Sequence, residues 1–375
     1  MKSAPWRRPA VRLLAAIHVA VLCIAGIVFS GGSAVAASVP GTVLNATSAT
    51  LPPELAPLAN GKRITYVTTA VNGTTTSATG LILTPKTGKR NQTVVWGHGT
   101  TGLADKCAPS TSQAVFWPEA RAAIAALLAK GWTVAAPDYP GLGTPLAHPY
   151  LIGESEARSM IDSVKAARNL DRSLTTKYVV DGHSQGGQGA LFAGQLAPAY
   201  DGTLELRGVA AIAPVSNVDM LAPLIPGTPG QGYLVMALYG LNAQDPTFDP
   251  NTVLNTPAKK TTSVLESGCL MEILDAYAPL TAGQLLVGGA LPQPVVTKLA
   301  RYDNPAQSAP SAPMLIVQGT ADEAVPYGIT AGPLLDELHA YNQPVDFVPV
   351  DGANHDGAVF ATVDQVASWI AARFG

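Results

Sequence analysis

The chain has 375 residues, of which 47% are hydrophobic and only 13% charged, and it contains 36 glycines and 31 prolines. This composition excludes a disordered chain and suits one large globular domain with long ordered loops. The formal net charge is −3 at pH 7, so the chain as a whole is not a basic, nucleic-acid-binding protein.

The first 36 residues have the parts of an export signal. Four basic residues come first, an apolar run from Leu13 to Phe29 follows, and a small-x-small cleavage site ends at Ala36. We therefore expect a signal peptide at residues 1–36 and a secreted protein cleaved near Ala36. A retained membrane anchor is the alternative, although the apolar run is short for a span and a cleavage site follows it. The Arg-Arg pair at residues 7 and 8 leaves a twin-arginine export route open.

Cleavage removes four positive charges and no acidic residue, so the formal charge of the mature chain moves from −3 to −7. No basic patch remains that would bind nucleic acid. Loss of Cys23 leaves Cys107 and Cys269, and two isolated cysteines in an oxidising compartment are most simply a disulfide. No Cys/His cluster supplies the further ligands that a metal site needs.

After the signal, residues 37–60 have no clear period and predict an extended arm. Alternating segments at 62–70 and 74–83 then predict a β-hairpin that turns at Asn72-Gly73. Further along, the apolar patterns predict strands at 93–96, 132–138, 177–181 and 206–213, and helices at 114–130, 154–170 and 188–196. This alternation predicts an α/β protein with a mostly parallel sheet flanked by helices on both faces.

The alternation stops between residues 214 and 313, where Pro and Gly separate short helical segments such as 234–241 and 282–291. We expect this mainly helical insertion to be a cap or lid over the active site, with an ordinary surface subdomain as the alternative. The βα pattern returns with strands at 314–319 and 345–350 and helices at 329–341 and 358–374. The core is therefore expected to comprise residues 61–213 and 314–375.

The segment Gly182 to Gly187 reads Gly-His-Ser-Gln-Gly-Gly and lies between a predicted strand and a predicted helix. This is the pattern of a nucleophile elbow, a sharp turn whose glycines avoid clashes with the neighbouring elements. The pattern is weak by itself in so glycine-rich a chain, and its strand-to-helix context makes Ser184 the predicted nucleophile.

A serine hydroxyl becomes an effective nucleophile when an imidazole takes its proton and a buried carboxylate orients the imidazole. Two histidines follow Ser184. His339 lies in a segment with helical spacing, where a solvated face is expected, whereas His355 lies in a loop after the last strand and is the predicted base. Asp322, also in a loop after a strand, is the predicted acid, and the adjacent Glu323 is the alternative.

Acyl transfer also needs backbone N–H groups aimed at the developing oxyanion. Gln185, the residue after the nucleophile, is expected to supply one. The other is expected from the glycine-rich loop after the strand at 93–96, from Thr100 or, as second choice, Thr101, unless this loop is merely a tight turn. His98 and His183 are interpreted as structural neighbours of the site.

Several further segments belong with these motifs: Gly97 to Ser110, Ala136 to Gly141, Leu196 to Tyr200 after the elbow, Asp322 to Tyr327, and the loop of His355. Together they resemble the secretory lipase family, a group of exported α/β-hydrolases, over most of the mature chain. The resemblance implies an α/β-hydrolase fold with an inserted, mainly helical lid and hydrolysis of water-insoluble esters.

The same resemblance places Ser184, Asp322 and His355 on the triad positions of that family. It also implies a disulfide between the Cys-Ala-Pro-Ser segment and the lid region, which here joins Cys107 to Cys269. The yeast type of the family carries an acidic residue in the oxyanion loop, where this chain reads His-Gly-Thr-Thr at 98–101. The resemblance therefore supplies no side chain for the oxyanion hole.

These observations predict a secreted serine ester hydrolase, foremost a triacylglycerol lipase that forms an acyl-enzyme on Ser184 without a metal or organic cofactor. Its expected partners are a lipid or small ester substrate and a lipid–water interface, and the oligomeric state stays open. The alternatives are a carboxylesterase for short soluble esters, an acyltransferase or peptidase on the same fold, and a non-catalytic binding protein. The last would lack a triad member, and here all three occur in order.

Overall fold

The computed structural model describes residues 39–375. The signal peptide expected at residues 1–36 lies outside the described residues. Within the described part of the chain, no helix combines the length and the apolar character that crossing a bilayer requires.

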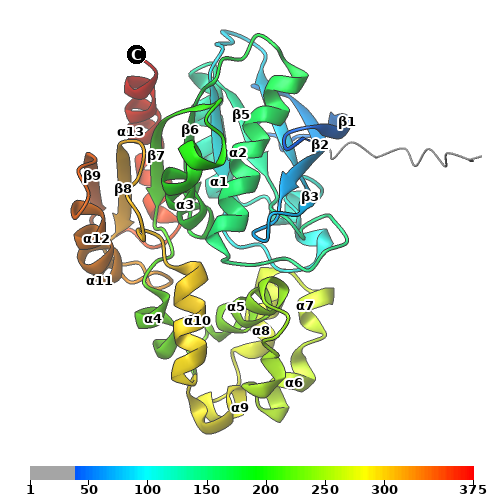
Figure 1. Ribbon diagram of the computed structural model, residues 1–375, viewed down its shortest axis with the longest axis vertical. Coiled ribbons are helices and arrows are strands. Elements are labelled where there is room, and N and C mark those ends of the chain that lie inside the picture. Colours follow the sequence, from blue (N-terminus) through cyan, green and yellow to red (C-terminus); the bar gives the residue numbers. More distant parts are fainter. Residues whose placement is uncertain (1–38) are drawn as a thin grey trace, which may run out of the picture. The chain divides into compact units, whose positions relative to one another are not determined.

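The centre of the fold is one sheet. Its strands are β1 (Val43–Ala49), β2 (Ala59–Thr69), β3 (Thr75–Pro85), β4 (Thr93–Gly97), β5 (Thr133–Pro137), β6 (Lys177–His183), β7 (Glu205–Ile212), β8 (Met314–Gly319) and β9 (Val345–Val350). Within residues 39–375 these nine strands have the order β1-β2-β3-β5-β4-β6-β7-β8-β9 (Figure 1). The pairs from β1 to β3 and from β3 to β5 are antiparallel, and all pairs from β5 to β9 are parallel. The mostly parallel sheet is confirmed.

The N-terminal strands contain one feature that the sequence pattern does not indicate. β1 lies within residues 37–60, expected as an irregular arm, and it pairs antiparallel with β2 at the edge of the sheet. Most of its side chains are exposed, so no alternation of buried and exposed residues marks it as a strand. The predicted hairpin is confirmed, because β2 pairs with β3 along their whole length. At its turn, Asn72 Oδ1 accepts the N–H of Thr74 over 3.0 Å.

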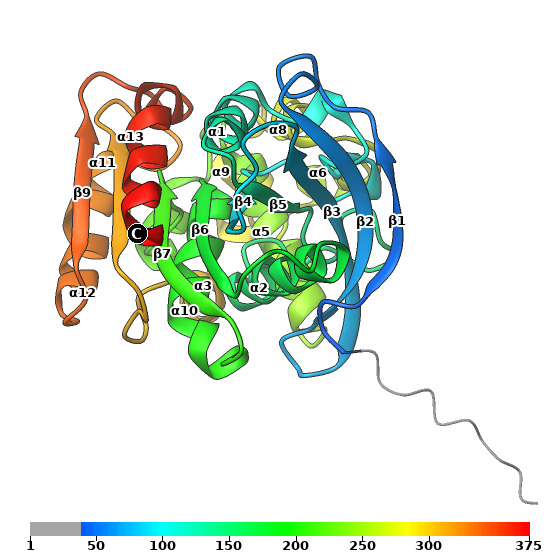
Figure 2. The same ribbon diagram turned by 90° about the horizontal axis from the view of Figure 1, so that it is seen from above.

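Helices cover both faces of the sheet (Figure 2). The helices of the core are α1 (Pro118–Ala129), α2 (Gly153–Leu170), α3 (Gln185–Tyr200), α11 (Tyr327–Ile329), α12 (Leu335–His339) and α13 (Gly357–Phe374). α1 and α13 pack together on one face, and α2 and α3 pack together on the other. The two layers follow from the pleat of the buried strands: Val179 faces the α1 and α13 side, whereas Tyr178 and Val180 face the α2 and α3 side.

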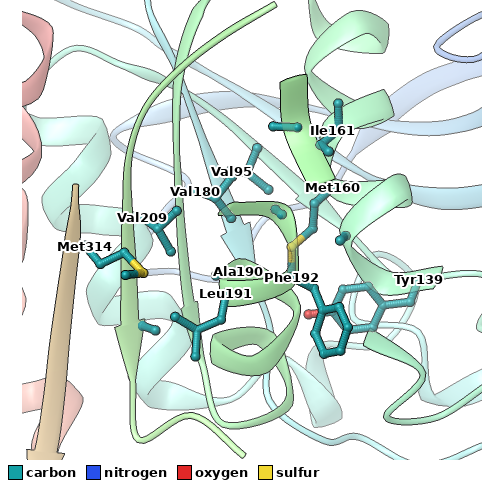
Figure 3. Close-up of a cluster of buried hydrophobic side chains, with 14 of the residues drawn as sticks. Val95, Tyr139, Met160, Ile161, Val180, Ala190, Leu191, Phe192, Val209 and Met314 are labelled. Carbon is teal, nitrogen blue, oxygen red and sulfur yellow. The ribbon is translucent and has the colours of Figure 1, made fainter. Parts of the chain in front are cut away.

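The core between the sheet and α2 and α3 is shown in Figure 3. Val95 and Val180 from the sheet meet Met160 from α2 and Leu191 from α3, and all four side chains are at most 1% exposed. Burying a side chain of this kind stabilises the fold by about 1.5–3 kcal/mol. This packing holds β6 and α3 rigidly on either side of the turn that carries Ser184.

A mainly helical insertion separates β7 from β8. Its helices are α4 (Val218–Leu221), α5 (Gln231–Gln244), α6 (Thr256–Thr261), α7 (Val264–Ser267), α8 (Leu270–Tyr277), α9 (Ala282–Leu285) and α10 (Gln293–Asp303). They enclose an apolar core of their own, and Figure 1 shows them together at one end of the sheet. The helical segment expected at 282–291 is shorter than its pattern suggests, because α9 ends at Leu285 and the next residue, Leu286, is extended and forms a β-bridge with Leu254.

The disulfide that the sequence predicts is present between Cys107 and Cys269. Cys107 follows β4 and Cys269 precedes α8, so the bond ties the insertion to the core across a sequence separation of 162 residues. A cross-link of this kind removes conformational freedom from the unfolded chain, and the effect grows with the length of the closed loop.

We expect the double variant Cys107→Ser/Cys269→Ser to have a free energy of unfolding about 2–5 kcal/mol lower than the wild type. Urea denaturation of the mature protein measures this difference, and a thiol assay on denatured, unreduced wild type should find no free thiol. An unchanged denaturation midpoint would show that the bond does not stabilise the fold.

Candidate active site

Ser184 stands at the sharp turn between β6 and α3. Its φ of +57° and ψ of −117° lie where an L-residue is strained. A Cβ on Gly182 would lie 2.2 Å from the carbonyl oxygen of Gly186, and a Cβ on Gly186 would lie 2.0 Å from that of Gly97. Only glycine fits at these two positions, so the backbone closes tightly behind Ser184 and presents its side chain at the end of β6.

His355 and Asp322 come from the loops after β9 and β8. Nδ1 of His355 donates a hydrogen bond to Oδ2 of Asp322 over 2.7 Å. The other carboxylate oxygen of Asp322 accepts the backbone N–H groups of Ala324 and Val325 at 2.9 Å each, and Oδ2 also accepts the amide of Gln318 at 2.8 Å. These bonds fix the carboxylate, and a donating Nδ1 leaves Nε2 of His355 as the proton acceptor.

Glu323 and His339, the alternatives named from the sequence, have different surroundings from Asp322 and His355. Glu323 is exposed and lines the cavity described next, while its neighbour Asp322 holds the hydrogen bond to His355. His339 is exposed at the end of α12 and does not line the cavity described next. The geometry therefore favours Asp322 over Glu323 and His355 over His339.

Ser184 and His355 line one cavity of about 510 Å³, a volume typical of small-molecule sites. Most of the remaining wall comes from the insertion. Representative apolar residues of that wall are Val218, Leu221, Ile225, Leu234, Ala237 and Leu299. The cavity thus joins a polar corner, where a carbonyl group can react, to an apolar space that suits a hydrocarbon chain.

The candidate oxyanion donors lie beside this corner. Gln185 is the first residue of α3, so its N–H is one of those that a helix leaves without an internal partner. Thr100 lines the cavity, and its Oγ1 lies 2.7 Å from the hydroxyl oxygen of Tyr150. Thr101 is fully buried, does not line the cavity, and accepts the N–H of Leu270 with its carbonyl group. The structure therefore places Thr100 at the cavity and Thr101 behind it.

His98 and His183 make structural contacts. The His98 ring stacks on Tyr139 with 4.4 Å between centroids, and its Nδ1 donates to the carbonyl of Gly99. Nε2 of His183 lies 3.3 Å from the carbonyl oxygen of His355, to which it donates. Burial holds the pKa of His183 well below its ordinary value, so this ring is neutral beside the His355 imidazole.

Among the described residues, His183, His355 and Asp356 bring possible metal-ligand atoms within 4.8 Å of one another. Both histidine rings already use one nitrogen within the protein, His355 toward Asp322 and His183 toward a backbone carbonyl. These bonds explain the arrangement without a metal ion, and we assign no metal centre to it.

Sequence reasoning missed three side chains that support the site, namely Tyr150, Gln318 and Glu156. Gln318 leaves a signal, because it is a lone amide in an otherwise apolar strand. Glu156 leaves none that sets it apart, because Glu154 is a second acid in the same turn of α2 and only the structure shows which of the two is buried. Tyr150 leaves none, because its contact with Thr100 joins residues 50 positions apart.

Three features define an α/β-hydrolase: a mostly parallel sheet, a strained serine after a central strand, and the chain order Ser, Asp, His. Residues 92–375 match the family model for Secretory lipase. The chain therefore belongs to the secretory lipase family.

Comparison with individual proteins agrees with this assignment. The chain is 28% identical over 288 residues to the secreted triacylglycerol lipase LIP4 of Malassezia globosa, covering 71% of this chain and 61% of the relative. Its fold is similar to that of Candida antarctica lipase A in its closed state, with a TM-score of 0.77 at 19% identity over 90% of this chain and 83% of the other. The rice cell wall degrading esterase LipA from Xanthomonas oryzae gives a TM-score of 0.73 at 23% identity over 90% and 98%. The chain spans about three fifths of the length of the Malassezia relatives that it matches.

Proposed function

We propose that this protein is a secreted serine ester hydrolase, and specifically a lipase that cleaves triacylglycerols. The observation that carries the proposal is the hydrogen bond from His355 to Asp322 beside a cavity that both His355 and Ser184 line. Membership of the secretory lipase family and the relative named as a secreted triacylglycerol lipase support it.

In the proposed reaction, Nε2 of His355 takes the hydroxyl proton of Ser184 as Oγ attacks the carbonyl carbon of the ester. Asp322 keeps Nδ1–H in place and stabilises the imidazolium that forms. The backbone N–H groups of Gln185 and Thr100 donate to the oxyanion. His355 then gives its proton to the leaving alcohol, and a water molecule repeats the sequence on the acyl-enzyme to release the acid.

We further propose that the insertion at residues 214–313 acts as a lid on the core of residues 61–213 and 314–375. Its apolar wall would hold the acyl chain, at about 0.8 kcal/mol for each methylene group buried. Met220 and Leu224, in and just after α4, are 46% and 65% exposed, and Leu224 also lines the cavity. These side chains are suited to contact a lipid–water interface.

Secretion is part of the same proposal. Cleavage near Ala36 would release a mature chain that begins just before the edge strand β1. The basic start, apolar run and small-x-small site of residues 1–36 support this route, as does the name of the Malassezia relative, a secreted lipase.

The test is an activity profile of the mature protein against p-nitrophenyl esters of increasing acyl length, followed by tributyrin and a long-chain triacylglycerol emulsion. A lipase should cleave the emulsion and prefer longer acyl chains. Hydrolysis confined to short soluble esters would leave a carboxylesterase, and turnover of amides or transfer to added alcohols would point to a peptidase or an acyltransferase.

We expect Ala237→Trp to shorten the acyl chain that the enzyme accepts. Ala237 lines the cavity from α5, and an indole there would displace two or three methylene groups of a long chain. At about 0.8 kcal/mol each, the ratio of kcat/KM for p-nitrophenyl laurate to that for the acetate should fall about 15- to 60-fold. Ala243→Trp, on the same helix but away from the cavity, is the control. Equal ratios in the two variants would mean that the acyl chain lies elsewhere.

A further inference from the structure

The loop between β5 and α2 contacts both halves of the proposed oxyanion hole. Within it, the hydroxyl oxygen of Tyr150 lies 2.7 Å from Oγ1 of Thr100. The next residue, Leu151, has φ +60° although it is not glycine, a strained conformation that persists only where the surroundings hold it. The carbonyl of Leu151 accepts the amide of Gln188 over 3.0 Å. The loop is therefore attached to the Thr100 segment on one side and to α3 on the other.

Glu156 connects this loop to the residue that follows Ser184. Its side chain lies on α2 and is completely buried. One carboxyl oxygen, Oε1, accepts the N–H of Leu151 over 3.2 Å and the side-chain amide of Gln185 over 2.8 Å. A single atom thus holds both the strained loop and Gln185, the first residue of α3, whose backbone N–H is a proposed oxyanion donor.

The same amide of Gln185 also lies 3.3 Å from Nε2 of His148. Nδ1 of His148 donates to the carbonyl of Pro140, and burial lowers the pKa of His148 to about 4. The ring is therefore neutral, and Nε2 is an acceptor. The Gln185 side chain is fixed by two acceptors, so it cannot turn into the cavity.

Glu156 is also neutral at pH 7, because burial raises its pKa to about 8. The other buried acid near it is Asp303, at the end of α10, whose pKa is raised well above its ordinary value chiefly by burial. Tyr139 and Tyr150 on the neighbouring segments have pKa values raised by burial and stay neutral as well. A glutamine side chain would keep the neutral charge and the acceptor oxygen that Glu156 supplies.

A buried acid is costly, and here the second carboxyl oxygen, Oε2, has no hydrogen-bond partner among the described residues. An apolar side chain would serve packing better. An apolar side chain, however, cannot accept the N–H groups of Leu151 and Gln185, which come from opposite sides of the site.

We infer that Glu156 is a positioning residue of the oxyanion hole. It holds Gln185 directly and holds Thr100 through the loop of Tyr150 and Leu151. This inference rests on the proposed function and adds a residue to the same reaction. Glu156 touches no substrate, so its effect is on the placement of donors whose individual removal typically lowers kcat by about 10²–10³-fold.

The test compares Glu156→Leu, which loses the acceptor, with Glu156→Gln, which keeps it. With p-nitrophenyl butyrate, Glu156→Leu should lower kcat about 10- to 100-fold and change KM less than about twofold, because the oxyanion forms only in the transition state. Glu156→Gln should retain kcat within about threefold. The Ki of a trifluoromethyl ketone, which forms an oxyanion adduct, should rise in parallel with the loss of kcat/KM.

Asp162 provides the matched control. It is another buried acid on α2, but it accepts hydrogen bonds from Thr68 and Tyr200, away from the cavity. Asp162→Leu should lower the thermal midpoint and leave kcat within about twofold. If Asp162→Leu lowers kcat as much as Glu156→Leu does, the effect is general loosening of α2 and the inference is wrong.

Gln185→Met removes the same contact from its other end and keeps Glu156, so it tests the inference even if Glu156→Leu does not fold. It should lower kcat to a similar extent at unchanged KM, and wild-type kcat in this variant would overturn the inference. The proposed function is judged separately on the wild type. If the wild type cleaves no ester, both fail; if it is active and the variants match it, only the positioning role fails.

Discussion

Replacing Ser184 with alanine is expected to abolish ester hydrolysis while the protein stays folded. The variant keeps the Cβ and the strained backbone of the turn, and it removes only the hydroxyl oxygen that would attack the ester. Loss of the nucleophile from a serine triad typically lowers kcat about 10⁶-fold, because the remaining groups have no covalent path to support. Hydrolysis of p-nitrophenyl butyrate measures the loss, and the thermal midpoint shows whether the fold is kept.

A fluorophosphonate probe gives the same prediction an independent readout. The wild type should be labelled on the peptide that contains Ser184, and Ser184→Ala should not be labelled. Ser163→Ala is the control, because Ser163 is a buried serine on α2 that donates to the carbonyl of Met160 within its own helix and does not line the cavity. Residual labelling or turnover in Ser184→Ala would place the nucleophile elsewhere in the chain.

Asp322→Asn is expected to lower kcat about 10⁴-fold with little change in KM. Oδ1 of Asp322 accepts two backbone N–H groups, so the asparagine should keep its carbonyl oxygen there and turn its NH₂ group toward His355. Nδ1 of His355 then has to accept a hydrogen bond and the proton moves to Nε2. An imidazole in that tautomer cannot take the proton of Ser184.

Glu323→Gln is the matched control for this prediction. It makes the same chemical change one residue further on, where the side chain is exposed, and kcat should stay within about threefold of the wild type. If Glu323→Gln were the inactive variant and Asp322→Asn the active one, the roles of the two acids would have to be exchanged. Steady-state assays on both variants, with the Ser184→Ala background rate subtracted, give the comparison.

The positions of Ser184, Asp322 and His355 are predictable from the sequence for a physical reason. Each follows a predicted strand, and the carboxyl ends of parallel strands meet at one edge of a sheet. The structure brings Asp322 and His355 together there and opens one cavity to His355 and Ser184. The elbow is equally local in origin, because its glycines are needed wherever backbones approach as closely as Gly182 and Gly186 do.

Two other features, the strand β1 and the end of the helix α9, cannot be predicted from the local sequence pattern. β1 is held to the sheet by backbone pairing with β2 and carries mostly exposed side chains, so its sequence has no strand period. The helix predicted across 282–291 has apolar residues at helical spacing, and yet it ends at Leu285, because Leu286 is extended and forms a β-bridge with Leu254. In both cases the tertiary surroundings outweigh the local pattern.

By itself, then, the sequence determined the α/β order, the position of the elbow, the pairing of the last two cysteines and the set of residues from which a serine triad can be drawn. These are properties of hydrophobic period, glycine sterics and chain order. Only the tertiary structure distinguishes between adjacent candidate residues. It places Asp322, and not Glu323, in a hydrogen bond with His355, and it places Thr100, and not Thr101, at the cavity. Adjacent residues share the same local pattern, and the direction of their side chains depends on how the loop is held. The contact of Glu156 with Gln185, between residues 29 positions apart, exists for the same reason only once α2 and α3 have packed.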